Sequence, residues 1–379
     1  MDQIYLDYNA TTPIDPFVSS AMFPFITDHF GNPSSGHLYG NKAHEAVEIS
    51  RQQVAELLEC KPSEIIFTSG GTEANNYALK GVVGAYKAKG NHIITSSVEH
   101  PAITEVCRYL ETQGCKTTYL PVDKYGMINP SDVESAITNN TVLITIMHAN
   151  NEVGTIQPIK EISNIAHKHG VLFHSDCAQS IGKIEVMPSE LGVDLLSIAG
   201  HKLYGPKGVG ALFVRQGVDL ERQMHGANHE RGFRAGTENV IEIVGLGKAC
   251  QLISQNLPQY IKTMKTMRDR LEAGLRDSNI PLKIHGHPEF KLPNTCSVGF
   301  KNIEADELLV QLTKIAASAG AACHTDNVEI SSVLSAMNIP MAYAMGTIRL
   351  SVGRSTTEQE IDLALGEIQK VINEHFIKR

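Results

Sequence analysis

The sequence lacks several features that mark particular classes of protein. None of its apolar runs approaches the roughly 18–20 residues that a membrane span requires. It has no run of Lys and Arg, and 33 basic against 41 acidic residues give a net charge of −8; we therefore expect neither nucleic acid nor a membrane as partner. Seven cysteines without a CxxC pair, and no apolar signal segment after Asp2, predict free thiols and a cytoplasmic location.

The order of apolar and polar segments predicts two domains within the 379 residues. From about residue 60, short β-rich runs alternate with segments of helical spacing, which predicts an α/β domain whose mostly parallel sheet is covered on both faces. Its seven expected strands are Glu64–Ser69, His92–Ser97, Thr117–Leu120, Val142–Met147, Val171–Ser175, Asp194–Ile198 and Val209–Val214.

The pattern changes at Leu257–Pro258, where we expect a smaller α+β domain. Its expected elements are a long helix (Gln259–Ser278), a strand (Thr295–Phe300), a helix (Ala305–Lys314), a Gly/Ala-rich loop, a strand (Thr347–Val352) and a last helix (Thr357–Phe376). Residues 13–256 are thus assigned to the large domain, and residues 1–12 and 257–379 to the small domain. The N-terminal dozen residues are expected to cross the small domain or the site.

A glycine-rich turn follows the first expected strand and opens a helix. In Ser69-Gly70-Gly71-Thr72-Glu73-Ala74-Asn75, Gly70 and Gly71 let the backbone approach an anion, and the helix N-terminus and the Thr72 hydroxyl suit a phosphate. The same letters also describe a simple turn with Thr72 as the N-cap. The motif alone leaves both interpretations open.

Two charged residues follow later strands. Asp176 ends a strand, where ligands of open α/β sheets bind, and suits a cationic ring nitrogen or a metal, although it equally suits a helix cap. Lys202 lies in Gly200-His201-Lys202-Leu203-Tyr204, a tight turn whose burial would lower its pKa and favour Schiff-base chemistry. A surface lysine is the alternative, and Lys207 is expected to be one.

The three features in this order match the requirements of pyridoxal phosphate. That cofactor needs a phosphate anchor, an acid at its pyridine nitrogen and a lysine that joins its aldehyde. His100 and Gln179 lie at strand or loop ends, where they could stack on the ring and bond its phenolic oxygen.

Two further residues are candidates for attacking or binding a substrate. Cys323 lies in the Gly/Ala-rich stretch Ala319–Asp326, where exposure would favour a thiol nucleophile, although most cysteines are small buried hydrophobes. We assign that structural role to Cys60, Cys107, Cys115, Cys250 and Cys296. Arg349 interrupts an apolar strand and needs a partner, which is either a substrate carboxylate or an internal acid.

Sixteen histidines raise the question of a metal site. The candidate pairs are His167 with His169, His225 with His229, and His285 with His287. None shows the Cys/His spacing of a closed zinc site, and no HExxH motif occurs. We therefore expect no metal.

These residues stand in motifs that resemble the cysteine desulfurases and selenocysteine lyases of the class V aminotransferase group. The motifs are LDYNATTP, GNPSSGH, FTSGGTEANN, SSVEH, MHANNEVGTIQP, SDCAQSIGK, GHKLYGPKGVG, ERGFRAGTEN and IRLSVGR. The motifs follow one another in the family's order, and the resemblance covers the chain from about residue 4 to residue 376. The resemblance implies the fold type I architecture of pyridoxal phosphate enzymes and a homodimer with sites at the subunit interface.

The resemblance also implies residue roles. For the cofactor, it implies Lys202 as the Schiff-base lysine, Asp176 at the ring nitrogen, His100 stacked on the ring, Asn151 and Gln179 at the ring hydroxyl, and Gly71, Thr72, His201 and the partner's Thr237 at the phosphate. For the substrate, it implies Asn151 and Arg349 at the carboxylate and Cys323 attacking the sulfur.

Two positions depart from the family pattern. Ala199 replaces the usual phosphate-binding serine before Gly-His-Lys, which removes one hydrogen bond worth about 1–2 kcal/mol. The stretch His225–Glu230 lacks the usual run of glycines, which affects a loop at the expected dimer edge rather than the chemistry.

The implied reaction converts L-cysteine to L-alanine and leaves a persulfide on Cys323. Sulfur acceptors or iron–sulfur scaffold proteins are the implied partners. The alternative is a selenocysteine lyase acting on L-selenocysteine, because the stretch SAGAACH resembles that branch rather than the SSGSAC loop of housekeeping desulfurases. Two other classes remain, an aminotransferase that needs no thiol and a non-enzymatic scaffold with a vestigial fold.

Overall fold

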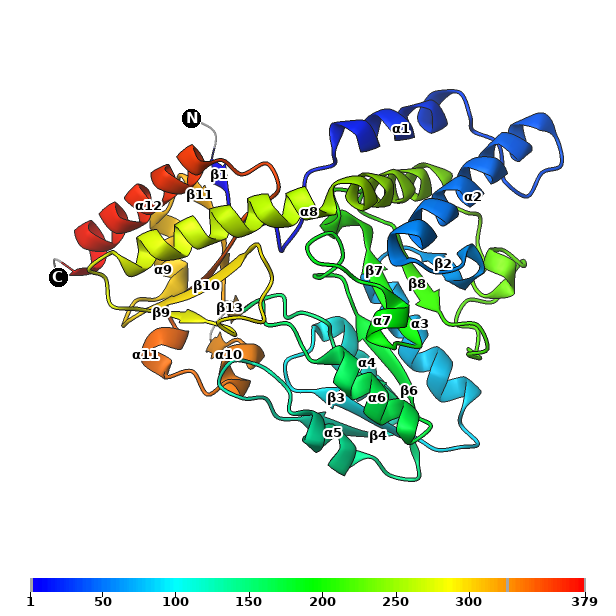
Figure 1. Ribbon diagram of the computed structural model, residues 1–379, viewed down its shortest axis with the longest axis horizontal. Coiled ribbons are helices and arrows are strands. Elements are labelled where there is room, and N and C mark those ends of the chain that lie inside the picture. The colour runs from blue at the N-terminus through cyan, green and yellow to red at the C-terminus, as the bar shows by residue number, and fades with distance from the viewer. Residues whose placement is uncertain (1–2, 325–326, 378–379) are drawn as a thin grey trace.

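The computed structural model describes residues 3–324 and 327–377 and contains a large and a small sheet (Figure 1). The large sheet has the strand order β2 (Ile65–Thr68), β8 (Gly210–Val214), β7 (Leu195–Ala199), β6 (Leu172–Asp176), β5 (Thr141–Thr145), β3 (His92–Ser96), β4 (Lys116–Leu120). Only β8 runs antiparallel to its neighbours in this sheet. The predicted mostly parallel sheet of seven strands is therefore confirmed.

Helices cover both faces of the large sheet, which explains why most of its strands are buried throughout. Helices α3 (Gly71–Ala85) and α4 (Pro101–Thr112) pack on one face, and α2 (Leu38–Leu58), α6 (Ile159–Lys168) and part of α8 (Val240–Arg276) pack on the other. In β2, Ile65 and Phe67 join one hydrophobic cluster and Ile66 the other, as the two-residue period of a strand dictates. The remaining helices of this part of the chain are α1 (Pro16–Thr27), α5 (Pro130–Ala136) and α7 (Pro188–Leu191).

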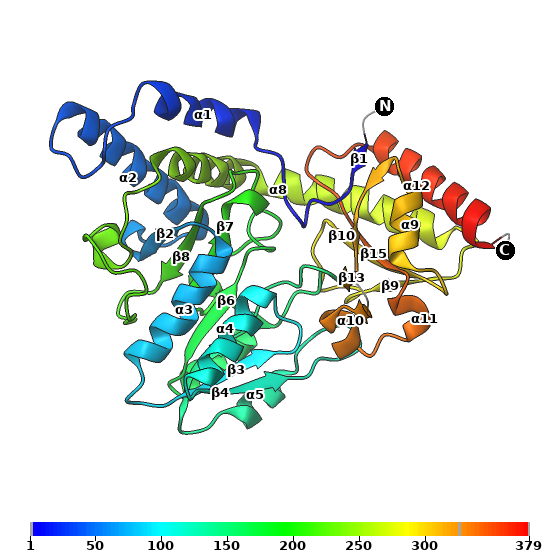
Figure 2. The ribbon, with the colours of Figure 1, turned by 180° about the vertical axis from the view of Figure 1, so that it is seen from behind.

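The small sheet is antiparallel, with the order β12 (Ser318–Ala319), β15 (Thr347–Ser351), β10 (Thr295–Phe300), β9 (Leu282–His285). It shares a hydrophobic cluster with α9 (Ala305–Gln311), α12 (Glu358–Ile372) and the end of α8. Strand β1 (Ile4–Tyr5) pairs with β11 (Ile315–Ala316) beside it. Figure 2 shows this part of the chain from behind, with α12 next to α8.

Helix α8 corrects one expectation. The change of pattern at Leu257–Pro258 predicted a helix beginning at Gln259, but one helix of 37 residues passes through Pro258. Proline removes one backbone hydrogen bond from a helix interior, and apolar packing on both sides offsets that loss. Ile253 packs in the cluster of the large sheet and Met264 in that of the small sheet.

The N-terminal segment runs from the small sheet to the ends of the large-sheet strands. After β1, Asp7 bridges to Ser351 of β15, and the backbone N–H of Thr12 donates to the carbonyl of His201 at 3.1 Å. The segment therefore crosses from one sheet to the other, as the sequence predicted, and it brings Asn9 and Ala10 beside Lys202.

The stretch around Cys323 also corrects an expectation. Where the sequence predicted a loop, β13 (Ala321–His324) pairs antiparallel with β14 (Asn327–Ile330). Two short helices follow, α10 (Ser332–Ala336) and α11 (Met341–Ala344). The backbone of Cys323 belongs to β13, while its side chain lies outside what the structure describes, as do Thr325 and Asp326.

Among the helices of the described residues, we find none with the length and apolar character needed to cross a bilayer.

Candidate active site

A cavity of about 310 Å³ lies at the carboxyl ends of the large-sheet strands; we call it the strand-end cavity. Its walls include most of the residues that the sequence singled out, namely Gly71, Thr72, His100, Asn151, Asp176, Gln179, His201, Lys202 and Arg349. Thr237 is not part of it and lines a separate pocket with Glu230 and Arg234. The structure thus gathers the expected cofactor residues, and leaves Thr237 apart within one chain.

The N-terminus of α3 forms one wall of the cavity. The N-cap is Gly70, whose φ of 150° suits glycine alone, and no side chain caps this end of the helix. Thr72 lies within the helix, so the interpretation of Thr72 as N-cap is wrong. The first-turn N–H groups of α3 are available to an anion, which is the arrangement that a phosphate requires.

Asp176 is held by two hydrogen bonds, and it caps no helix, because the next helix among the described residues, α7, begins only at Pro188. One oxygen accepts from the N–H of Ala178 at 2.9 Å, which shapes the following turn. The other accepts from Nδ2 of Asn75 in α3 at 2.7 Å, and the carboxylate lines the cavity. Asn75 was missed from the sequence, although Gly71 and Asn75 are four residues apart and therefore on one helix face.

Lys202 is the amine of the cavity. Its Nζ donates to the backbone carbonyls of Asn9 at 2.5 Å and Ala10 at 2.7 Å. Burial, assisted by the nearby Arg349 cation, lowers the pKa of Lys202 to about 8, although Asp7 and Asp176 oppose that shift. The share of neutral amine at physiological pH is therefore far larger than in an ordinary lysine, which suits a nucleophile. Lys207, in contrast, is exposed, as expected.

Two histidines flank the amine. His100 precedes α4 and its Nδ1 accepts from the N–H of Ala102 at 3.1 Å, which fixes the ring as the helix N-cap. Burial lowers the pKa of His100, with Lys202 adding to the shift and Asp176 opposing it. Burial also lowers the pKa of His201 to about 4, and its Nδ1 lies 3.2 Å from the Thr11 hydroxyl. Both rings are therefore neutral near pH 7.

Arg349 reaches the cavity from β15 and has an internal partner as well. Its Nη2 donates to Asp7 at 2.9 Å and to Ser318 at 3.1 Å, and its Nη1 donates to the carbonyl of Asn151 at 3.1 Å. Its Nε is buried without a partner among the described residues. The guanidinium is thus held in place by Asp7, and the three hydrogen bonds leave two of its five N–H groups for a carboxylate.

Asn9 was also missed from the sequence, and it connects the cavity residues. Its carbonyl accepts from Lys202 and from Nε2 of Gln179, the latter at 3.0 Å. Its Oδ1 accepts from Nζ of Lys183 at 3.1 Å. Asn9 lies about 170 to 190 residues before these partners, a separation at which local sequence patterns carry no signal.

Buried thiols elsewhere have raised pKa values. Cys107 and Cys250 are buried in the hydrophobic clusters, and burial raises the pKa of each to about 12. Cys296 is buried too, and Cys60 and Cys115 are partly buried. Such thiols stay protonated and react poorly as nucleophiles, which supports their structural assignment.

The cavity fits pyridoxal phosphate by its donor set. The uncapped end of α3 suits the phosphate, the carboxylate of Asp176 suits a protonated ring nitrogen, and the Lys202 amine suits the aldehyde. The volume is also in the range of small-molecule sites.

Comparisons with known proteins place the chain in a family. The model of the aminotransferase class-V family matches residues 4–364. The chain belongs to this family. A cysteine desulfurase IscS from Dictyoglomus turgidum is 44% identical over 372 residues, which cover 98% of this chain and 94% of the relative.

Two solved structures of the family are also similar. A NifS-like protein superposes with a TM-score of 0.93 at 38% identity, covering 98% of this chain and 100% of the other. SspA in complex with cysteine gives a TM-score of 0.83 at 36% identity, covering 93% and 99%. The resemblance read from the sequence motifs is thereby confirmed.

Proposed function

We propose that this protein is a pyridoxal phosphate-dependent cysteine desulfurase, which converts L-cysteine to L-alanine and transfers the sulfur to Cys323. The observation that carries the proposal is the strand-end cavity, where a free helix N-terminus, Asp176 and the low-pKa Lys202 meet. The relatives reported above support it, because they include a cysteine desulfurase and a structure with bound cysteine.

In this proposal, three groups of residues hold the cofactor. Gly71, Thr72 and His201 bind its phosphate, and Asp176 keeps the ring nitrogen protonated. His100 lies against the ring, and Asn151 and Gln179 bond its hydroxyl. When bound, the cofactor serves as the acceptor for the electron pair of the substrate Cα–H bond.

The chain's own residues then carry out the remaining steps. Arg349 and Asn151 bind the substrate carboxylate, and the freed Lys202 amine removes the Cα proton. The Cys323 thiolate attacks the substrate sulfur, so that an S–S bond forms as the Cβ–S bond breaks. The electron pair of the broken bond stays on the substrate carbons, which take up protons to give alanine, and Cys323 becomes a persulfide.

We further propose a homodimer, in which Thr237 reaches the phosphate in the partner subunit. The support is an apolar surface on α1, α2 and the segment between them, where Phe17, Phe23, Phe30 and Leu38 are each more than 60% exposed. A monomer rarely leaves so many large apolar side chains in water. Light scattering should give twice the chain mass for the wild type and a lower mass for Phe23→Glu.

The domain division is a proposal as well. Residues 13–256 would form the large domain, and residues 1–12 with 257–379 the small one. The separate hydrophobic clusters of the two sheets support the division. We also propose a cytoplasmic location and a sulfur acceptor or iron–sulfur scaffold protein as partner, supported by the described free thiols and by the name of the IscS relative.

The function is tested by measuring alanine released from L-cysteine and from L-selenocysteine. The wild type should form alanine from L-cysteine, and mass spectrometry should find an added sulfur on the peptide containing Cys323. Cys323→Ala should lose both signals, while the matched control Cys115→Ala should keep them.

The same assay separates the alternatives. Rapid turnover of L-selenocysteine, with little of L-cysteine and full activity in Cys323→Ala, would instead establish a selenocysteine lyase, which the comparisons do not favour over the desulfurase. Amino-group transfer to a keto acid would establish an aminotransferase. A colourless protein that releases no alanine would contradict every enzymatic proposal.

A further inference from the structure

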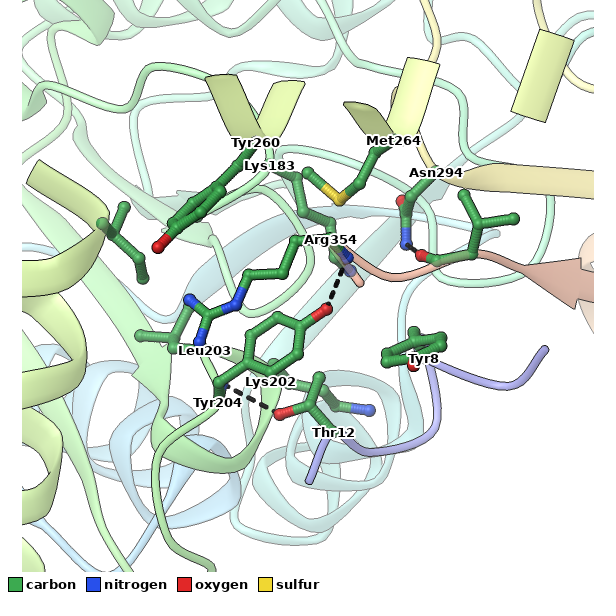
Figure 3. A pocket seen from close by; sticks show the side chains of 13 residues that line it. Tyr8, Thr12, Lys183, Lys202, Leu203, Tyr204, Tyr260, Met264, Asn294 and Arg354 are labelled. Atoms are coloured by element: carbon green, nitrogen blue, oxygen red, sulfur yellow. Dashed lines mark hydrogen bonds between the residues drawn. The ribbon is translucent and has the colours of Figure 1, made fainter. Parts of the chain in front are cut away.

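A second lysine, Lys183, lines a small interior cavity that Lys202 also lines (Figure 3). It is 5% exposed. Its Nζ donates to Oε1 of Gln179 at 2.7 Å and to Oδ1 of Asn9 at 3.1 Å. Within the described ranges, therefore, the partners of this buried amine are neutral carboxamides rather than acids.

The hydrogen bonds match an uncharged amine. A neutral amine has two N–H groups, and the structure provides two acceptors, whereas an ammonium group would bring a third N–H and a buried charge. Burial, together with the cations Lys202 and Arg349, also holds the pKa of Lys183 well below its usual range. The other titratable side chains around the small cavity between the two lysines are Tyr8, Tyr204, Tyr260 and Arg354.

Lys183 is connected to the cavity through Asn9 and Gln179. The carbonyl of Asn9 accepts from Lys202, while the Asn9 side chain accepts from Lys183 and from Asn294. Gln179 is fixed at both ends of its carboxamide, because Oε1 accepts from Lys183 and Nε2 donates to Asn9. Removing Lys183 would leave the Gln179 carboxamide with one of these two hydrogen bonds, the one to Asn9.

We propose that Lys183 is a positioning residue that acts as an uncharged amine: it fixes Gln179 and Asn9 by two hydrogen bonds and keeps a second positive charge away from Lys202. This inference rests on the proposed function, because Gln179 and Lys202 are the residues that would meet the cofactor. It predicts that Lys183 affects cofactor affinity through Gln179 and leaves the proton on the Lys202 nitrogen undisturbed.

The test is a pH titration of the visible absorption band of the holoenzyme, which reports the proton on the Lys202 nitrogen. Lys183→Met is similar in size and removes the amine. For an uncharged Lys183, the midpoint should stay within about 0.3 pH units of the wild type, whereas loss of a charge should raise it by about one unit or more. Lys183→Arg adds a permanent cation and should lower the midpoint by about one unit or more.

A second readout tests the positioning role. The dissociation constant of the cofactor from Lys183→Met should rise about five- to tenfold, because Gln179 loses one of the two hydrogen bonds that orient it. Lys87→Met, which changes an exposed lysine outside the strand-end cavity, should match the wild type in both measurements.

The two measurements distinguish a charged from an uncharged Lys183 and test its positioning role separately. A midpoint that rises by a unit in Lys183→Met would show a charged lysine and overturn the inference, and an unchanged dissociation constant would overturn the positioning role. If Lys183→Arg fails to fold, Lys183→Met still decides the question. A wild type without any visible band would contradict the proposed function itself, rather than the role of Lys183.

Discussion

The strand-end cavity and the hairpin β13–β14 differ in how the fold holds them. Many cavity residues lie at the ends of strands in a seven-stranded sheet, and Asp176, Gln179 and Arg349 each have a hydrogen-bond partner from another segment. The hairpin that carries Cys323 forms a two-stranded sheet by itself among the described residues. Rigid placement suits a site that orients a cofactor, and a separate element suits a residue that must pass sulfur outward.

Serines on either side anchor the hairpin close to the cavity. Before it, Ser318 donates to Asp7 at 2.9 Å, and after it, Ser331 donates to Glu152. Asp7 also holds Arg349, and Glu152 follows Asn151 in the chain. The two regions therefore meet at the proposed carboxylate site, so that substrate binding and the approach of Cys323 share the same residues.

The largest expected effect on activity comes from a substitution in the strand-end cavity. Asp176→Asn removes the charge that would keep the ring nitrogen protonated, and kcat should fall by about 10²–10³-fold. Asn75→Ala removes only a hydrogen bond to that carboxylate and should cost less than tenfold. Alanine release from L-cysteine measures both, and equal losses in the two variants would contradict the role given to the Asp176 charge.

The low pKa of Lys202 predicts how the rate of cofactor attachment to the apoprotein depends on pH. In the apoprotein the amine must be neutral to join the cofactor, so the attachment rate should rise about tenfold per pH unit below about pH 8 and level off above it. Absorbance after mixing with pyridoxal phosphate measures the rate. A rate that continues to climb to pH 10 would indicate a lysine of ordinary pKa and an open, solvated site.

A smaller effect should distinguish the hairpin from the cavity. Ser331→Ala removes one anchor of the hairpin and the N-cap of α10, so sulfur transfer to Cys323 should slow about tenfold. Cofactor affinity should not change, because the Ser331 hydroxyl bonds to Glu152 and Val333, neither of which lines the cavity. The exposed neighbour variant Ser332→Ala serves as the control. Reduced cofactor binding in Ser331→Ala would show that the two regions are not separable.

The smallest effect restores a missing bond in the cavity. Ala199 lies against Gly71, where a Cβ added to the glycine would be 3.2 Å from the Ala199 Cβ. Ala199→Ser places a hydroxyl beside the proposed phosphate site, and the cofactor dissociation constant should fall about two- to fivefold. An equilibrium titration measures it, and weaker binding would mean that the phosphate lies elsewhere.

Much of the cavity was predictable because its residues occupy local patterns. The strands β10 and β6 lie within a residue of their predicted positions, since both are short β-rich runs between segments of other character. The residues at those ends follow directly, as Asp176 and Lys202 show. The glycine turn before α3 is likewise a local signal.

What the sequence could not provide depends on contacts between distant segments. Asn9 beside Lys202 and Asp7 beside Arg349 are pairs nearly 200 or more residues apart. The continuation of α8 through Pro258 is decided by packing on both sides rather than by local propensity. The hairpin was missed because its small residues resemble a loop, and pairing between its two short strands forms it.

The central claim is that Lys202 is joined to pyridoxal phosphate. Reduction of the holoenzyme with borohydride, followed by proteolysis and mass spectrometry, tests it directly. We predict the mass of the reduced cofactor on Lys202, with Lys183 and Lys207 unmodified. The label on either of those lysines, or no label on a protein that is folded and loaded with the cofactor, would contradict the account.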